Sequence, residues 1–207
     1  MCPPGELMRT DRLQALCDGV FAVALTLLVL GLPSPEGSRH LGRDLLARWP
    51  AYAAYVVTFV TVGIVWVNHH VLLDRVARAS RVFLELNLML LLFVAVMPWP
   101  TGLLASYAGE PAQARPAAIV YGMTMVMLSG SFAAIWIYLQ RRDDLAHPAA
   151  RPALGRAVRR SLVGPAVYAV GIVAAVGDPS AAFAVFAAAA VYFAASGRSP
   201  AAAPPAR

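Results

Sequence analysis

The sequence predicts an all-α, polytopic membrane protein with six transmembrane helices in one unit covering residues 1–207. Of its 207 residues, 59% are hydrophobic and only 14% are charged, whereas soluble domains have about 45–50% apolar and about 25% charged residues. The apolar residues also form long blocks separated by short polar stretches, which a single soluble core does not require. Two cysteines, Cys2 and Cys17, are too few for a disulfide framework. A secreted disulfide scaffold, a disordered chain and a nucleic-acid-binding domain are therefore excluded.

The six spans follow from the thickness of the bilayer. A hydrocarbon core of about 30 Å needs about 20 apolar residues in a helix. Runs of about that length lie at 13–32, 49–67, 82–104, 117–139, 161–176 and 181–195. The last two are short and rich in alanine, and residues 177–180, which read Gly-Asp-Pro-Ser, predict a tight turn between them. We expect residues 141–160 to form a solvated loop that touches anionic lipid, and residues 196–207 to be a disordered tail.

The arginines predict the orientation. The net charge of +6 comes from 17 basic residues, all arginine, against 11 acidic ones. If the six spans hold, 13 of these arginines lie on the same side of the membrane as the N-terminus and four on the other side. The positive-inside rule then places both termini in the cytoplasm. No small-x-small cleavage site follows the first apolar run, so we expect that run to stay as a span and not to be removed as a signal peptide.

The first span carries an acidic residue, Asp18, near its start. An ionisable group at that depth normally faces protein or water and not lipid. Helical periodicity places one stripe on a different face, made of Arg12, Leu16, Gly19, Val23, Thr26, Leu27 and Leu30. If this stripe lines a pore, Asp18 points into the surrounding bundle as an anchor. The alternative is that the stripe is an ordinary packing face.

Three motifs, which follow one another along the first three spans, resemble those of a known family. They are the stretch from Arg12 to Leu30, then Trp66-Val-Asn68-His69-His70 at the end of the second span, then Met97-Pro98-Trp-Pro100-Thr101-Gly-Leu-Leu at the end of the third. Together they resemble the prokaryotic branch of the lysosomal potassium channel family, transmembrane protein 175. That family carries Arg-x-x-x-Phe-Ser-Asp-Gly early in its first helix, followed by Thr-Leu-Leu. The residues that match in the first span are Arg12, Asp18, Gly19, Phe21, Ala22, Thr26, Leu27, Leu28 and Leu30.

The chain departs from the family at Leu16 and Cys17, where members have Phe and Ser. The second change replaces a hydroxyl with a thiol, which is a weaker hydrogen-bond donor. We expect these two changes to affect local hydrogen bonding and to leave the fold intact.

The resemblance implies a channel subunit that assembles around a pore lined by the first helix of each chain. Because only one Arg-to-Asp-Gly motif is present in the sequence, it implies a homotetramer. The apolar constriction of the family maps onto Val23, Leu27 and Leu30, and Thr26 is the polar pore-lining residue. Such a hydrophobic constriction gates by excluding water. We therefore expect K⁺ to pass, with weak selectivity among monovalent cations.

The polar residues of the first two motifs are expected to form a framework that holds the first helix at its angle. This framework is predicted to consist of Arg12, Asp18, Trp66, Asn68, His69 and His70, with one of the histidines reaching Asp18 or Trp66. Adjacent histidines on a helix point about 100° apart, so they cannot both face one metal ion. We expect no metal site.

Other functions fit less well. Residues 61–64, Thr-Val-Gly-Ile, resemble the start of a potassium-channel filter but lie inside an unbroken apolar span. A secondary transporter of a cation or small solute is the alternative function, although interrupted spans and inverted repeats are weak here. We expect no enzymatic activity, no cofactor besides the permeant K⁺, and no nucleic-acid partner. The expected partners are the lipid bilayer and monovalent cations, and the expected location is the cell membrane of a bacterium, crossed several times.

Overall fold

The structure is a computed structural model that describes residues 10–37, 39–107 and 109–196. Every regular element within these residues is helical. The β pairing seen among them is one isolated antiparallel bridge between Val76 and Ala146. The predicted all-α class is therefore confirmed.

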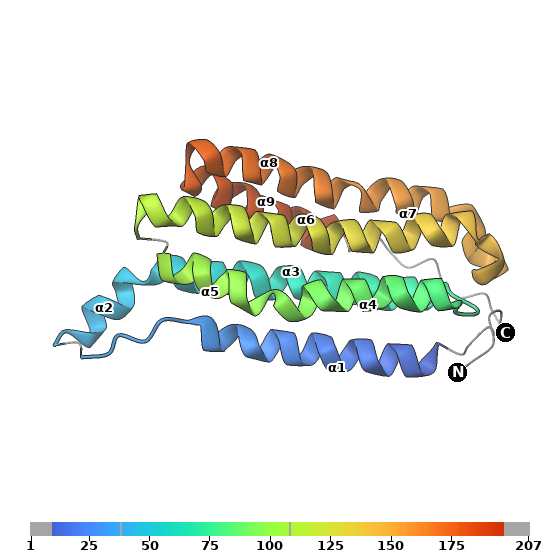
Figure 1. The fold of residues 1–207 in the computed structure, drawn as a ribbon, viewed down its shortest axis with the longest axis horizontal. Coiled ribbons are helices and arrows are strands. Elements are labelled where there is room, and N and C mark those ends of the chain that lie inside the picture. Colours follow the sequence, from blue (N-terminus) through green and yellow to red (C-terminus); the bar gives the residue numbers. More distant parts are fainter. Residues whose placement is uncertain (1–9, 38, 108, 197–207) are drawn as a thin grey trace.

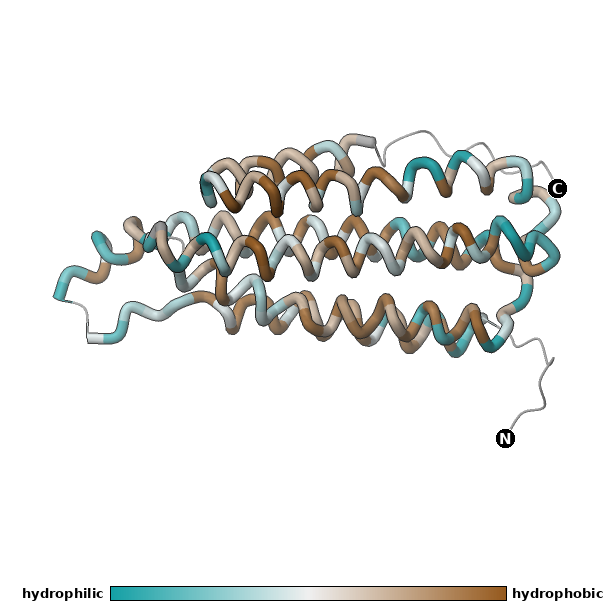
Figure 2. The backbone as a smooth tube through the Cα atoms, turned by 45° about the horizontal axis from the view of Figure 1, so that its top comes forward, coloured by the Kyte–Doolittle hydropathy of each residue, from teal (hydrophilic) through white to brown (hydrophobic). Residues whose placement is uncertain are grey.

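The described residues contain six apolar helical segments, which is consistent with the six predicted spans. Five helical segments are long and apolar enough to cross a bilayer, namely Asp11–Gly31, Trp49–Leu73, Arg81–Tyr107, Ala112–Arg141 and Pro148–Gly177. A sixth apolar helix, Pro179–Ala195, is shorter, and at 1.5 Å per residue it is about 26 Å long. Figure 2 shows hydrophilic residues concentrated at the two ends of the bundle and hydrophobic residues along its middle.

The first half of the chain forms three passes. Its elements are α1 (Asp11–Leu27), η1 (Leu28–Gly31), α2 (Leu41–Ala47), α3 (Trp49–Leu73), α4 (Arg81–Val96) and α5 (Pro98–Tyr107). Ser80 caps α4, because its Oγ accepts a hydrogen bond from the backbone N–H of Phe83 at 3.2 Å. The third span breaks at Met97 since Pro98 and Pro100 have no N–H to continue the helix.

The second half forms the other three passes. Its elements are α6 (Pro111–Arg141), η2 (Asp143–Leu145), η3 (Pro148–Ala153), α7 (Leu154–Ser161), α8 (Val163–Gly177) and α9 (Pro179–Ser196). The backbone N–H of Ser180 donates to Asp178 Oδ1 at 2.8 Å. The turn between α8 and α9 is thus shorter than predicted, because Pro179 and Ser180 already belong to α9.

One sequence prediction about this half is wrong. Residues 141–160 are not a simple solvated loop, because they contain η2, η3 and most of α7. Leu145 and Leu154 are buried there, so apolar side chains fix the segment against the bundle.

The short helix α2, in the first half of the chain, was also not predicted. The predicted disordered tail lies outside the described residues, apart from Ser196 at the end of α9.

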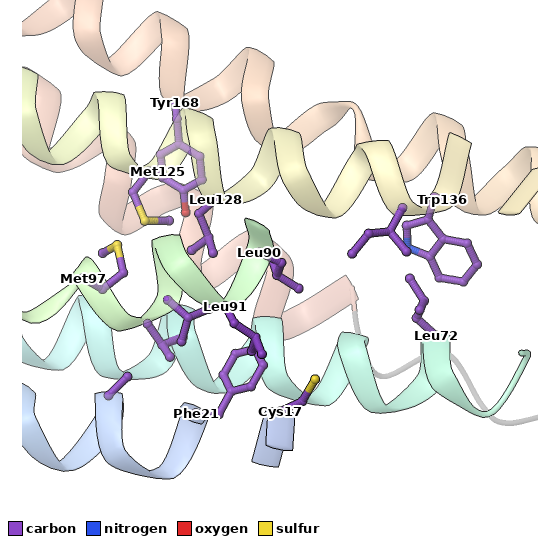
Figure 3. Close-up of a cluster of buried hydrophobic side chains, with 14 of the residues drawn as sticks. Cys17, Phe21, Leu72, Leu90, Leu91, Met97, Met125, Leu128, Trp136 and Tyr168 are labelled. Atoms are coloured by element: carbon purple, nitrogen blue, oxygen red, sulfur yellow. The ribbon is translucent and has the colours of Figure 1, made fainter. Parts of the chain in front are cut away.

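The helices form a bundle with α1 along one edge and α8 along the opposite edge (Figure 1). Helices α3, α4 and α5 lie next to α1, and α6 lies between them and α8. Buried side chains from α1, α4 and α6 meet in the interior, among them Phe21, Leu91 and Leu128 (Figure 3). Because lipid is as apolar as these side chains, close packing more than hydrophobic burial holds such helices together.

The start of α1, the α3–α4 connection and the segment from the end of α6 through α7 lie at one end of the bundle (Figure 1). We call it the arginine-rich end, and its described arginines are Arg12, Arg75, Arg78, Arg81, Arg141, Arg142, Arg151, Arg156, Arg159 and Arg160. The described arginines of the opposite end are Arg39, Arg43, Arg48 and Arg115.

Candidate functional site

Helix α1 has a buried face and an exposed apolar face. Its buried residues are Leu13, Cys17, Phe21 and Ala24, followed by Leu28 in η1. They face α3 and α4. All seven residues of the predicted stripe are exposed. The structure therefore leaves a row of apolar side chains on α1 that the chain itself does not cover.

The four residues predicted to form the constriction and its polar lining lie on this exposed face. Val23 is 56% exposed, Leu27 41% and Leu30 76%. The Thr26 hydroxyl donates to the backbone carbonyl of Val23 at 2.8 Å. Leu30 lies in η1, because the helix tightens into a 3₁₀ turn after Leu27, so its direction departs slightly from the α-helical wheel.

A shallow groove of about 440 Å³ runs along the stripe and includes several of its residues. It is lined by Ala15, Leu16, Gly19, Val20, Val23, Ala24 and Leu27 of α1 and Ala95 of α4. An added Cβ at Gly19 would have no atom within 4 Å. The groove is thus apolar, half of its lining residues are alanine or glycine, and no other part of the described chain covers it.

Polar contacts fasten the first half of α1 to the end of α3. The indole Nε1 of Trp66 donates to Asp18 Oδ1 at 2.8 Å. The rings of Trp66 and His70 lie 6.3 Å apart, and Gln14 Nε2 lies 3.3 Å from His70 Nδ1. The carboxylate in the first span therefore has a donor on the neighbouring helix, and His70 contacts both Trp66 and α1.

His69 points to a different helix. It is 2% exposed, and its Nε2 donates to Asn87 Oδ1 of α4 at 2.8 Å. Asn87 in turn donates to the carbonyl of Phe83 at 2.7 Å. The His69 ring also lies 5.8 Å from the ring of Phe21, which is on the buried face of α1.

Sequence reasoning missed Asn87 as the partner of His69. The available signal was position, because the two residues lie at similar distances from the loop that joins α3 and α4, and helices joined by a short loop pack antiparallel.

Two other framework residues lie apart from these contacts. Asn68 donates to the carbonyl of Ile64 on its own helix at 2.8 Å. Arg12 is exposed and takes no part in the bonds described above.

The other end of α1 is fixed by a close approach of backbones. A Cβ placed on Gly31 would lie 3.1 Å from the Cα of Gly102 in α5. Gly102 follows Thr101, whose hydroxyl donates to the carbonyl of Met97 at 2.8 Å and lies 3.3 Å from the Thr58 hydroxyl of α3. The stripe residues between the two fastened ends of α1 therefore remain exposed on a well-held helix.

The filter-like residues 61–64 lie inside the continuous helix α3. Their carbonyls belong to the helix, and the Thr61 hydroxyl donates to the carbonyl of Val57 at 2.7 Å. Among the described residues no group of three or more His, Cys, Asp or Glu side chains is placed to hold a metal ion.

Comparison with known proteins now identifies the family. The family model of the endosomal/lysosomal potassium channel TMEM175 matches residues 12–98. A potassium channel of Streptomyces collinus is 44% identical over 152 residues, which are 72% of this chain and 74% of that protein. The chain belongs to the TMEM175 family.

Other members of the family agree over most of the chain. A potassium channel of Chamaesiphon minutus is 37% identical over 80% of this chain and 83% of its own length. The crystal structure of a homologue of the lysosomal potassium-selective channel TMEM175 from Chamaesiphon minutus superposes with a TM-score of 0.83 at 31% identity. That match covers 92% of this chain and 98% of the solved one. The shared architecture thus extends beyond the motifs in the first three spans.

Proposed function

We propose that four copies of the chain form a potassium channel with the α1 helices around a central pore. The observation that carries the proposal is the exposed stripe on α1, which holds Val23, Thr26, Leu27 and Leu30 on a helix fastened at both ends. The bacterial relatives named above are called potassium channels. The permeant K⁺ is the substrate, and no cofactor or enzymatic activity enters the proposal.

The chemistry of the stripe fits a hydrophobic gate. Rings of Val23, Leu27 and Leu30 from four subunits would make a narrow apolar neck, and such necks block ions by excluding water. A small splay of the helices would then hydrate the neck and allow conduction. Thr26 donates its hydroxyl proton to Val23, so the hydroxyl oxygen keeps lone pairs for a passing cation. Few oxygens in the neck favour weak selectivity.

The contacts between α1 and its neighbours would set the angle of the pore helix. The Trp66–Asp18 bond and the His70 contacts join α1 to α3. His69 braces α4 against α3 and touches Phe21. In this proposal these side chains, together with Asn68 and Arg12, act as positioning residues and do not touch the ion.

The groove along the stripe supports assembly of identical subunits. In membranes, helices associate where small residues allow backbones to approach, and Ala15, Gly19 and Ala95 provide such a surface. One motif per chain favours four subunits. The excess of arginines at the arginine-rich end favours that end, and both termini, in the cytoplasm of a bacterial cell.

The experiment is potassium efflux from proteoliposomes that contain the purified protein. Leu27→Ala and Leu30→Ala widen the neck and are expected to raise the flux per tetramer. Val173→Ala is the control, because Val173 is 73% exposed on α8, at the opposite edge of the chain from α1. Native mass spectrometry of the same samples is expected to give four subunits.

Two outcomes would contradict the proposal. If wild type and both leucine variants leave potassium gradients untouched while the protein is a verified tetramer, the stripe is a packing face. If the flux saturates at low potassium concentration and depends on a counter-ion, the protein is a secondary transporter.

A further inference from the structure

A second and larger cavity lies away from α1. It has a volume of about 650 Å³ and is lined by α3, α6, η3, α7, α8 and α9. Binding cavities for small molecules measure about 300–1,000 Å³, so this one has room for a ligand. No residue of α1 lines it, and it therefore does not belong to the proposed ion pathway.

The cavity is long and changes character along its length. The residues that line it on α3 run from Thr61 to Val71, which corresponds to about 15 Å at 1.5 Å per residue, and Arg75 continues the lining beyond the end of that helix. Away from the arginine-rich end, Met125, Leu128 and Tyr168 make it largely apolar. Figure 3 shows these three side chains lying close together, with Tyr168 extending from α8.

The mouth at the arginine-rich end is strongly basic. Arg156 and Arg160 are one turn apart on α7, so they lie on the same face of that helix. Arg75 lines the cavity from the connection between α3 and α4, and its guanidinium carbon lies 5.3 Å from the centre of the Trp136 ring. Among the described residues that line the cavity none is acidic. Three guanidinium groups therefore border an opening whose interior is apolar.

We propose that this cavity binds one anionic phospholipid. Guanidinium groups pair strongly with phosphate, and basic pockets between transmembrane helices on the cytoplasmic side bind lipid head groups. The phosphate lies between Arg75, Arg156 and Arg160, and an acyl chain follows the apolar part of the cavity past Met125 towards Tyr168. The lipid fastens α7 and α8 to α3 and α6. The proposal does not depend on conduction.

Native mass spectrometry of the purified protein in detergent tests the proposal. Phosphatidylglycerol is expected to bind at one molecule per subunit, at least ten-fold more tightly than phosphatidylcholine. The double variant Arg156→Gln, Arg160→Gln is expected to weaken phosphatidylglycerol binding by about 30-fold, from the usual gain per basic residue near anionic lipid. Arg159→Gln is the matched control, because Arg159 is exposed on the same helix but does not line the cavity. It is expected to bind like wild type.

A further variant tests the apolar part. Ala157 lines the cavity, and Ala157→Trp is expected to block the acyl chain while leaving all three arginines in place. Melting curves identify any variant that fails to fold. The double arginine variant changes only exposed side chains of α7, so it keeps the proposal testable if Ala157→Trp is unstable.

Three results would overturn the proposal. If phosphatidylcholine binds as tightly as phosphatidylglycerol, the cavity accepts any lipid or detergent and does not select for an anionic head group. Equal binding of glycerol phosphate without acyl chains would mean a site for free anions. An equal loss in Arg159→Gln would mean a diffuse effect of charge and not a site.

Discussion

The contact between Gly31 and Gly102 provides the sharpest prediction about stability. A Cβ at Gly31 would lie 3.1 Å from the Cα of Gly102 and 3.6 Å from the carbonyl oxygen of Pro98. These atoms belong to the backbone of α5, so they cannot rotate out of the way. Overpacking of this kind costs about 1–3 kcal/mol. For a chain of this size we expect Gly31→Ala to lower the melting temperature by about 2–10 °C.

The same substitution at the partner glycine, Gly102→Ala, is the control. A Cβ at Gly102 would lie 3.5 Å from the Cα of Gly31, an ordinary contact distance. Because Gly102 lies within α5, alanine there also gains up to about 1 kcal/mol of helix propensity. Gly102→Ala is therefore expected to melt at or above the wild-type temperature.

The assay is thermal unfolding of the purified protein in one detergent, followed by intrinsic tryptophan fluorescence. If Gly31→Ala melts like wild type, the backbones are not in contact as described. If both variants lower the melting temperature equally, the difference between the 3.1 Å and 3.5 Å distances does not affect stability. Either result would refute the reasoning that η1 is held closely against α5.

Two further substitutions test the contacts around α1. Trp66→Phe removes the donor to Asp18 and is expected to lower the free energy of unfolding by about 1.5–3 kcal/mol, at the low end because Asp18 is partly exposed. Thermal unfolding measures this loss. An unchanged melting curve would show that the bond does not help to hold α1. Asn87→Leu leaves the buried ring N–H of His69 without its acceptor and is expected to cost about 1–3 kcal/mol. The double variant with His69→Leu is expected to recover part of that loss in the same assay, and a purely additive loss would contradict the pairing.

The sequence predicted an all-α chain of long apolar helices because a bilayer requires a similar length of every helix that crosses it. It did not predict where helices continue beyond the bilayer. Helix α3 extends to Leu73, and α6 already begins at Pro111. Hydropathy marks only the part in lipid, whereas the helical extensions depend on local hydrogen bonding and packing.

The exposed stripe on α1 could be derived from periodicity, because only one face of a packed helix can be buried. The partners of polar residues could not be derived in the same way. Both His69 and Asn87 stand out as polar side chains in apolar spans, yet the register between α3 and α4 decides that they meet. The cavity at Arg156 and Trp136 is lined by five α-helices and the short helix η3, so nothing in one stretch of sequence reveals it.

The central claim is that α1 lines the pore, and modification of one cysteine tests it most directly. Val23→Cys is made with Cys2→Ser, and Cys17 is kept because it is fully buried. A charged thiol reagent is added while the potassium current is recorded in a planar bilayer, with Val173→Cys as the control. We predict that the reagent reduces the current of Val23→Cys and leaves the control unchanged. Currents that persist unchanged in a verifiably modified Val23→Cys tetramer would contradict the account.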